Sequence, residues 1–180
     1  MAKYDYFSGG LDELLMDIET LKMDIKSANL QMVKDLAIET DLTIKRNARA
    51  ETAIDVSDIV ANNRVSPLMI NGEIVMGSVY NSSEAATYAE FGYGIIGKDQ
   101  PYPDFNFFDG SASSLGDWTY DVKNHGLKGW WYTDKMGVKR RSVGTKAHRT
   151  FYNSYKDVSL KVEGMGLKAF QNLQLGGKGK

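Results

Sequence analysis

Residues 87–97 read TYAEFGYGIIG, a stretch that combines an alternating pattern, three glycines and an acidic residue among apolar ones. Side chains alternate between the two faces of an extended chain, so Glu90 would share a face with Tyr88, while Ala89 would lie on the other. We therefore predict a strand over residues 86–93 that ends at the glycines.

The glycines of this stretch form the pattern G-x-G-x-x-G, at Gly92, Gly94 and Gly97. That pattern cradles a dinucleotide pyrophosphate when it follows a strand and a helix opens at its third glycine. Here residues 98–103 read KDQPYP, and the prolines disfavour a helix at this point. A strand that ends in a loop is the better interpretation, and no cofactor is expected.

Length and composition exclude several classes of protein. The chain has 180 residues and no cysteine, which rules out disulfides, thiolate metal sites and a cysteine nucleophile. No apolar run approaches the ~20 residues that span a bilayer, and residues 1–6 lack the segments of a signal peptide. We expect a protein that is made in the cytoplasm and has no membrane partner.

Charge is distributed unevenly although the net charge is only −1. Residues 1–60 carry 7 basic and 12 acidic side chains, residues 61–120 carry 2 and 7, and residues 121–180 carry 13 and 4. Such a division indicates either a surface for nucleic acid or complementary faces that meet when copies or partners assemble.

Residues 7–47 are predicted to form one long helix, which continues to about residue 61. An apolar stripe with 4-3-4-3 spacing follows it, at Phe7, Leu11, Leu14, Ile18, Leu21, Ile25, Ala28 and Met32. A second apolar row recurs every seven residues, at Met16, Met23, Leu30, Ala37 and Ile44. Two rows need two neighbours, so the second row is a candidate subunit interface; a bundle formed within one chain is the alternative.

The middle of the chain changes to strand patterns. Residues 68–82 are predicted to form a hairpin around Asn71 and Gly72, because both positions of an Asn-Gly turn tolerate positive φ. Residues 118–122 and 130–133 alternate like two further strands. Short connections between these segments favour an antiparallel sheet.

A C-terminal helix is predicted over residues 147–162, with Gly164 and Gly166 interrupting it. Together these elements define an α+β fold, in which a long N-terminal helix and a C-terminal helix pack on an antiparallel β-sheet with extended loops. Residues 1–61 are expected to be a helical region or arm, and residues 62–180 the sheet with its C-terminal helix.

Catalytic and metal-binding patterns are weak. His125 and His148 are the only histidines, and neither has a second histidine at helical spacing. The G-x-S-x-G elbow of hydrolases, the Walker lysine motif and the H-E-x-x-H motif of zinc proteases are absent from the sequence. Glu90 is better explained as a structural acid, hydrogen-bonded by a backbone turn or by Arg140 or Arg141, than as a catalytic acid. We expect no enzyme activity, no metal and no catalytic residue.

A basic cluster near aromatic residues is a candidate surface for DNA or for a partner protein. Its members are Lys139, Arg140, Arg141, Lys146 and Arg149. A third possibility uses the aromatic residues alone, with Trp118, Trp130, Trp131 and residues 105–108 forming a platform for a sugar.

Three stretches keep the content and order of the motifs of a known family. They are residues 88–97, YAEFGYGIIG, residues 118–132, WTYDVKNHGLKGWWY, and residues 144–154, GTKAHRTFYNS. The chain resembles the tail-component family of long-tailed bacteriophages, the tail-completion or head–tail joining proteins of the phage neck. The residues that carry this resemblance are Tyr88, Ala89, Glu90, Phe91, Gly92, Gly94, Gly97, His125, Gly126, Gly129, Trp130, His148 and Phe151.

The resemblance implies a structural role in the virion. Such a protein would assemble with itself into a ring, usually a hexamer, at the head–tail interface around the DNA channel. Its partners would be a connector or head-closure protein on one side and a tail terminator or tail tube protein on the other. DNA would pass close by without being read in sequence. A tail terminator and a head-closure protein are close alternatives.

Overall fold

The structure is a computed structural model that describes residues 8–51, 55–99, 128–134 and 136–171. Its contacts divide the chain into two compact units. Unit 1 comprises residues 1–40, 65–79 and 158–180, and unit 2 comprises residues 41–64 and 80–157. The two units are described in turn.

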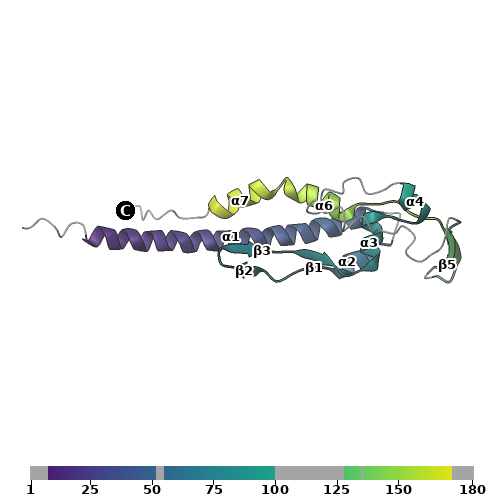
Figure 1. Cartoon of the computed structure of the whole chain (residues 1–180), viewed down its shortest axis with the longest axis horizontal. Coiled ribbons are helices and arrows are strands. Elements are labelled where there is room, and N and C mark those ends of the chain that lie inside the picture. The colour runs from purple at the N-terminus through teal and green to yellow at the C-terminus, as the bar shows by residue number, and fades with distance from the viewer. Residues whose placement is uncertain (1–7, 52–54, 100–127, 135, 172–180) are drawn as a thin grey trace, which may run out of the picture. The chain divides into compact units, whose positions relative to one another are not determined.

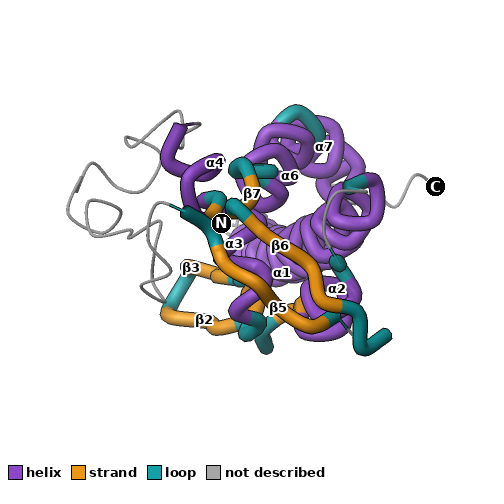
Figure 2. Tube along the Cα trace, turned by 90° about the vertical axis from the view of Figure 1, so that its right-hand side faces the viewer, coloured by secondary structure: helices purple, strands orange, loops and turns teal. Residues whose placement is uncertain are grey.

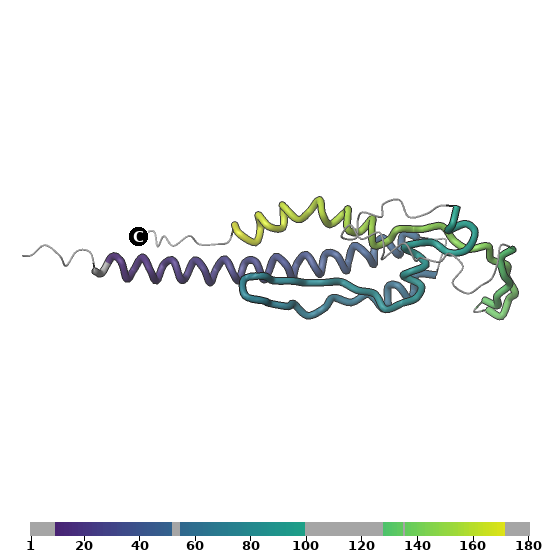
Figure 3. The backbone as a smooth tube through the Cα atoms, in the orientation of Figure 1, coloured from purple at the N-terminus to yellow at the C-terminus, as the bar shows by residue number. Residues whose placement is uncertain are grey.

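The long N-terminal helix is confirmed, and it supplies residues to both units. Helix α1 (Ser8–Ala50) has 43 residues and runs without a break (Figure 3), since no glycine or proline occurs between Leu11 and Ala50. It ends at Ala50, earlier than predicted. A separate short helix, α2 (Ser57–Asn62), follows, and the Asp55 carboxylate accepts hydrogen bonds from the N–H and hydroxyl of Ser57 at its start.

Unit 1 contains the predicted hairpin. Strands β2 (Met69–Asn71) and β3 (Ile74–Met76) pair antiparallel, with Asn71 opposite Ile74 across the turn. Gly72 has a φ of +63°, as the Asn-Gly turn requires. Past β3, the chain packs against α1, because a Cβ added to Gly77 would lie 3.2 Å from Val33 Cγ1.

Helix α7 (Val162–Gln171) lies beside α1 in the same unit (Figure 1). Lys161 forms an ion pair with Glu39, and a Cβ added to Gly166 would lie 3.4 Å from Met32 Cε, so the two helices run antiparallel. The prediction that Gly164 and Gly166 interrupt the C-terminal helix is wrong. Contact with α1 outweighs the low helix propensity of glycine.

Unit 2 is built from short elements around a small apolar core. They are β1 (Asn63–Val65), β4 (Val79–Asn81), α3 (Glu84–Phe91), α4 (Gly94–Asp99), β5 (Trp130–Thr133), β6 (Lys139–Ser142), β7 (Gly144–Thr145) and α6 (Thr150–Ser159). The border between the units falls within β1, β4 and α6. The core contains Ala48, Ile59, Ala86 and Ala89.

The strands of the described chain form three two-stranded sheets, β1–β4, β2–β3 and β5–β6. Figure 2 shows β5 and β6 side by side as an antiparallel ribbon. The predicted α+β class is confirmed, with small antiparallel sheets in place of one continuous sheet. The predicted strand at residues 118–122 lies outside the described residues. The division of the chain after residue 61 stays a prediction.

The predicted strand over residues 86–93 is wrong, because this segment forms helix α3. The Ser83 hydroxyl accepts the N–H of Ala85 at 3.1 Å, which caps the start of the helix. At the other end Gly92, with a φ of +79°, donates its N–H to Tyr88. The buried side chains Ala86, Ala89 and Glu90 recur with helical spacing.

The glycines of α7 and of the β2–β3 turn predict opposite responses to alanine. A Cβ at Gly164 or at Gly72 would meet no atom within 4 Å, but only Gly72 has a positive φ. Gly164→Ala should raise the free energy of unfolding by about 0.5–1 kcal/mol, and Gly72→Ala should lower it by about 1 kcal/mol. Urea unfolding of both variants tests this. A destabilising Gly164→Ala would contradict the placement of Gly164 inside a helix.

Candidate functional site

The residues of the 87–97 stretch meet the start of α6 in what we term the α3–α6 junction: residues 89–94 with residues 143–152. The Ala89 carbonyl accepts the N–H groups of His148 and Arg149, at 2.7 and 3.2 Å. The Glu90 carboxylate accepts two more N–H groups. Phe151 donates to Oε2 at 2.7 Å, and Tyr152 donates to Oε1 at 3.0 Å. Two neighbouring residues thereby satisfy four N–H groups at a helix start.

Burial explains why Glu90 needs these bonds. Its side chain is only 4% exposed, and a buried carboxylate is costly unless hydrogen bonds replace its water. The first turn of a helix supplies both free N–H groups and a positive dipole end. The prediction of a hydrogen-bonded structural acid is therefore confirmed, with backbone N–H donors. A carboxylate held in this way is poorly placed to act on a substrate.

Glycines are required at the junction because two backbones cross in contact. A Cβ at Gly144 would lie 1.9 Å from Tyr93 O, and one at Gly92 would lie 2.7 Å from Ala147 N. Isolated bridges join Tyr93 to Thr145 and Gly94 to Gly144. The G-x-G-x-x-G pattern therefore serves the crossing. It follows a helix rather than a strand, so the setting of a dinucleotide site is not met.

Aromatic rings cover the same crossing. Tyr93 is buried, with its ring centroid 4.8 Å from that of Tyr88 and 4.9 Å from that of Trp130. Burial raises the pKa of Tyr88, and the hydrogen bond that it donates to Glu84 raises it further. The family-motif residues Tyr88 and Trp130 are thus brought together around the buried Tyr93.

His148 is fixed between two polar side chains. Its Nε2 lies 3.0 Å from Thr145 Oγ1, and its Nδ1 lies 2.5 Å from Glu51 Oε2, an ion-pair distance when the ring is protonated. The order hydroxyl, imidazole, carboxylate is that of a hydrolase triad. However, the His148 side chain is completely buried, so it has no access to a substrate. Sequence reasoning missed Glu51, because 97 positions separate it from His148.

The end of α1 and helix α6 are joined by side chains within unit 2. Asn47 Nδ2 lies 3.1 Å from both Ser154 Oγ and Asp157 Oδ2, and the Ser154 hydroxyl donates to the Thr150 carbonyl at 2.6 Å. Ser154 is fully buried. This polar contact fixes the helix that Glu90 caps.

Three residues of the predicted basic cluster lie on the β5–β6 ribbon. Lys139, Arg140 and Arg141 follow one another on β6 and are exposed. Arg140 Nε is 2.6 Å from Asp134 Oδ2, and Arg141 donates to the Lys128 carbonyl. The hydrogen bonds to Glu90 described above come from the backbone N–H groups of Phe151 and Tyr152, and not from these two arginines.

The other two basic residues are placed differently. Lys146 is exposed on the segment that leads into α6, whereas Arg149 is half-buried in the junction, with a φ of +58°. Arg149 therefore belongs to the structural junction, and the exposed basic surface consists of Lys139, Arg140, Arg141 and Lys146. Whether this surface meets DNA or protein stays a prediction.

Trp130 and Trp131 face opposite sides of the ribbon. Trp130 packs on Tyr93, while Trp131, which pairs with Arg141 across the strands, is 70% exposed. The two indoles therefore do not form one flat platform. Trp118, residues 105–108, His125 and Gly126 lie outside the described residues.

The second apolar row of α1 divides into a covered and an uncovered part. Ala37 and Ile44 are buried by the chain itself and Leu30 is half-buried, whereas Met16 and Met23 are 69% and 64% exposed. The proposed subunit interface can therefore use only the early part of this row. That use stays a prediction.

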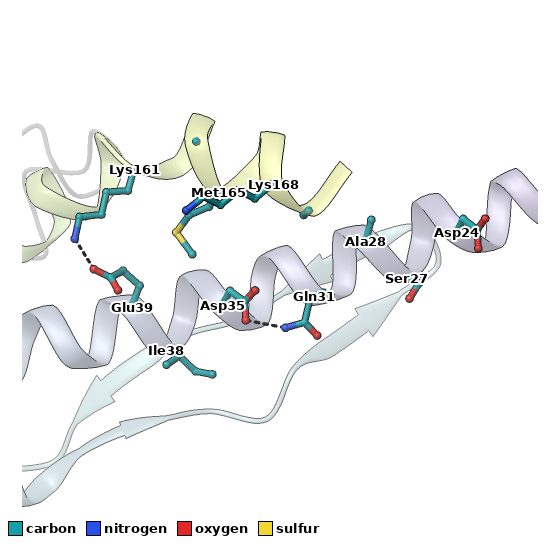
Figure 4. Close-up of a pocket in the computed structure, with 12 residues that line it drawn as sticks. Asp24, Ser27, Ala28, Gln31, Asp35, Ile38, Glu39, Lys161, Met165 and Lys168 are labelled. Atoms are coloured by element: carbon teal, nitrogen blue, oxygen red, sulfur yellow. Dashed lines mark hydrogen bonds and ion pairs between the residues drawn. The ribbon is translucent and has the colours of Figure 1, made fainter. Parts of the chain in front are cut away.

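An open groove of about 1220 Å³ lies between α1 and α7 in unit 1 (Figure 4). Its α1 wall carries Asp35, which accepts a hydrogen bond from Gln31 at 2.7 Å, and Glu39, which pairs with Lys161. Met165 supplies an apolar patch on the α7 wall. These polar groups pair with one another. The open groove also means that α7 covers only part of the α1 surface beside it.

Neither a metal-binding cluster nor a membrane-spanning helix is found in the described part of the chain. No three histidine or carboxylate side chains there gather in a way that could hold a metal ion. Among the same residues, no helix combines the length and apolar character needed to cross a membrane.

Comparison with known proteins adds no identification. No protein-family model, curated protein or solved structure matches the chain.

The junction predicts a graded response at Glu90. Glu90→Gln keeps one acceptor and loses the charge, so it should lower the free energy of unfolding by about 1 kcal/mol, and Glu90→Ala should lower it by about 2–3 kcal/mol. Urea unfolding followed by circular dichroism measures both. Glu73→Ala, at an exposed carboxylate, is the control and should change stability by less than about 0.5 kcal/mol. Equal effects at the two positions would contradict the capping role.

The ribbon turn predicts a pH dependence. The Arg140 hydrogen bond, and then the N–H groups of Val138 and Met136, lower the pKa of Asp134. Because the folded pKa is lowered, the carboxylate stabilises the turn above the ordinary value and stops doing so as pH falls through the lowered pKa. The amide NMR signals of Met136 and Val138 should titrate together with a midpoint below 3.8. Asp134→Asn should abolish this titration; a midpoint at or above 3.8 would count against the contacts.

Proposed function

We propose that this protein is a non-enzymatic structural subunit of the neck of a long-tailed bacteriophage. It would assemble as a ring, with six copies as the leading expectation, and join the capsid connector to the tail tube around the DNA channel. Its location would be the virion, at the head–tail interface. A tail terminator or a head-closure protein remains the closest alternative.

The observation that carries the proposal is the use of the motif residues. Glu90 caps α6, Gly92 and Gly94 permit the backbone crossing, and His148 is buried between Thr145 and Glu51. The motif that resembles the phage family thus serves folding, because its acidic side chain is held by the backbone N–H groups of Phe151 and Tyr152. A junction in which these motif residues serve the fold suits a building block better than an enzyme.

Exposed surfaces supply a second argument. Leu15, Met16 and Met23 are each more than half exposed on the early part of α1, and Lys139 and Arg141 are exposed on the β5–β6 ribbon. Apolar and basic surfaces on separate elements favour a subunit that makes more than one kind of contact. A ring between two partners needs such contacts.

A carbohydrate-binding module is the alternative of another class. It would use exposed tryptophans as stacking platforms, and Trp131 fits that requirement. Trp130 argues against a joint platform, since it packs on Tyr93 from the opposite side of the ribbon. Saturable quenching of tryptophan fluorescence by oligosaccharides would favour this alternative.

Light scattering of the purified chain, alone and mixed with connector or tail tube protein, tests the proposed function. The expected result is a mass of several subunits, about six, that appears when a partner is added or is already present without it. Substitution of Lys139 and Arg141 by glutamate should weaken the complex that forms at low salt, because it reverses the charge of the ribbon. A chain that ignores both partners at every salt concentration would contradict the proposal.

A further inference from the structure

The first half of α1 carries a heptad-spaced apolar seam that the described residues of unit 1 leave uncovered. Leu11, Leu14, Ile18 and Ile25 are 56%, 55%, 52% and 44% exposed, and Leu21 is partly exposed. Within unit 1, α7 and the β2–β3 hairpin lie beside later turns of α1 (Figure 1). We call the five residues the α1 seam.

Later residues of the same apolar stripe are covered where α1 has a neighbouring element. Ala28, one step further along, is 8% exposed, and Met32 is the residue that Gly166 of α7 approaches. The stripe is therefore continuous in sequence but occupied only in its later part. The α1 seam is the part for which the described chain supplies no cover.

Residue types along the seam favour one kind of neighbour. Leu11, Ile18 and Ile25 take the a positions of a heptad, and Leu14 and Leu21 take the d positions. Isoleucine at a with leucine at d favours parallel two-stranded coiled coils. Such residues fit the same segment of another copy, because each side chain then fills a hole formed by its counterparts.

Charges beside the seam select the parallel direction. Asp17 takes a g position and Lys22 the e position five residues later, and both are exposed. In a parallel pair, the g position of each helix faces the following e position of the other helix. Asp17 of each copy then lies beside Lys22 of the other, which gives two attractive contacts. An antiparallel pair would place g against g and bring Asp17 towards Asp24, which repels it.

We propose that the α1 seam pairs two copies of this chain as a parallel coiled coil, with Asp17 of each copy beside Lys22 of the other. The pairing concerns the free chain and does not rest on the proposed function. Two heptads make a small interface, so the pair exchanges with the monomer as concentration changes.

Exchange of charges between the two positions gives a specific test. Analytical ultracentrifugation of the full chain from about 1 µM to about 1 mM covers the range of weak interfaces. Asp17→Lys and Lys22→Asp should each raise the dissociation constant about tenfold, because each turns two attractions into repulsions. The double variant should restore wild-type pairing, and a mixture of the two single variants should form mixed pairs.

Effects on the helix itself are separated by the neighbouring charges. Asp17→Lys places a lysine four residues after Glu13 and so adds an attractive pair within its own helix, whereas Lys22→Asp gains an attractive pair with Lys26 and loses one with Glu19. Glu13→Lys and Lys26→Glu are the matched controls, since they change the charge equally but lie off the seam. They should leave the dissociation constant within about twofold of wild type.

Ile18→Asp tests the apolar part and should raise the dissociation constant by about a hundredfold or more while circular dichroism stays unchanged. A wild-type chain that is monomeric up to about 1 mM would overturn the proposal. So would a double variant that fails to restore pairing, which would exclude the parallel direction. A monomer that Ile18→Asp unfolds would show that the chain's own residues cover the seam, and this also overturns it.

Discussion

Unit 2 depends on the two carboxylate oxygens of Glu90 and the N–H groups that they accept at the start of α6. A helix start leaves N–H groups without partners inside the helix, and a buried carboxylate lacks water, so each needs the other. The Ala89 carbonyl completes the set. The glycine crossing accompanies these bonds, since Gly92 and Gly94 let the backbone of residues 143–147 approach closely.

Local sequence was a good guide where one chain segment determines the geometry. The uninterrupted helix α1 and the Asn-Gly hairpin were predicted because propensity and turn chemistry act over a few residues. The strand predicted for residues 86–93 is wrong, because the Ser83 cap and the helical spacing of Ala86, Ala89 and Glu90 determine the structure there. The alternation of side chains along the segment does not. The break predicted at the glycines of α7 is wrong because the packing of this helix on α1, seen at Gly166 and Met32, is a tertiary effect.

The candidate site was predictable in kind but not in its contacts. Glu90 stood out as an acid among apolar residues, and its structural role followed from the cost of burial. The donors to Glu90, the backbone N–H groups of Phe151 and Tyr152, could not be predicted, because almost every residue type carries a backbone N–H. The contact between Glu51 and His148 could not be predicted either. No sequence spacing relates a residue after the end of α1 to one just before α6.

The bonds that fix the junction join residues that are 61 and 62 positions apart. The entropy lost on closing a loop grows only with the logarithm of its length, about 0.6 kcal/mol for each doubling. The entropic cost of bringing residues 89–94 to residues 143–152 therefore depends only weakly on how many residues separate them along the chain.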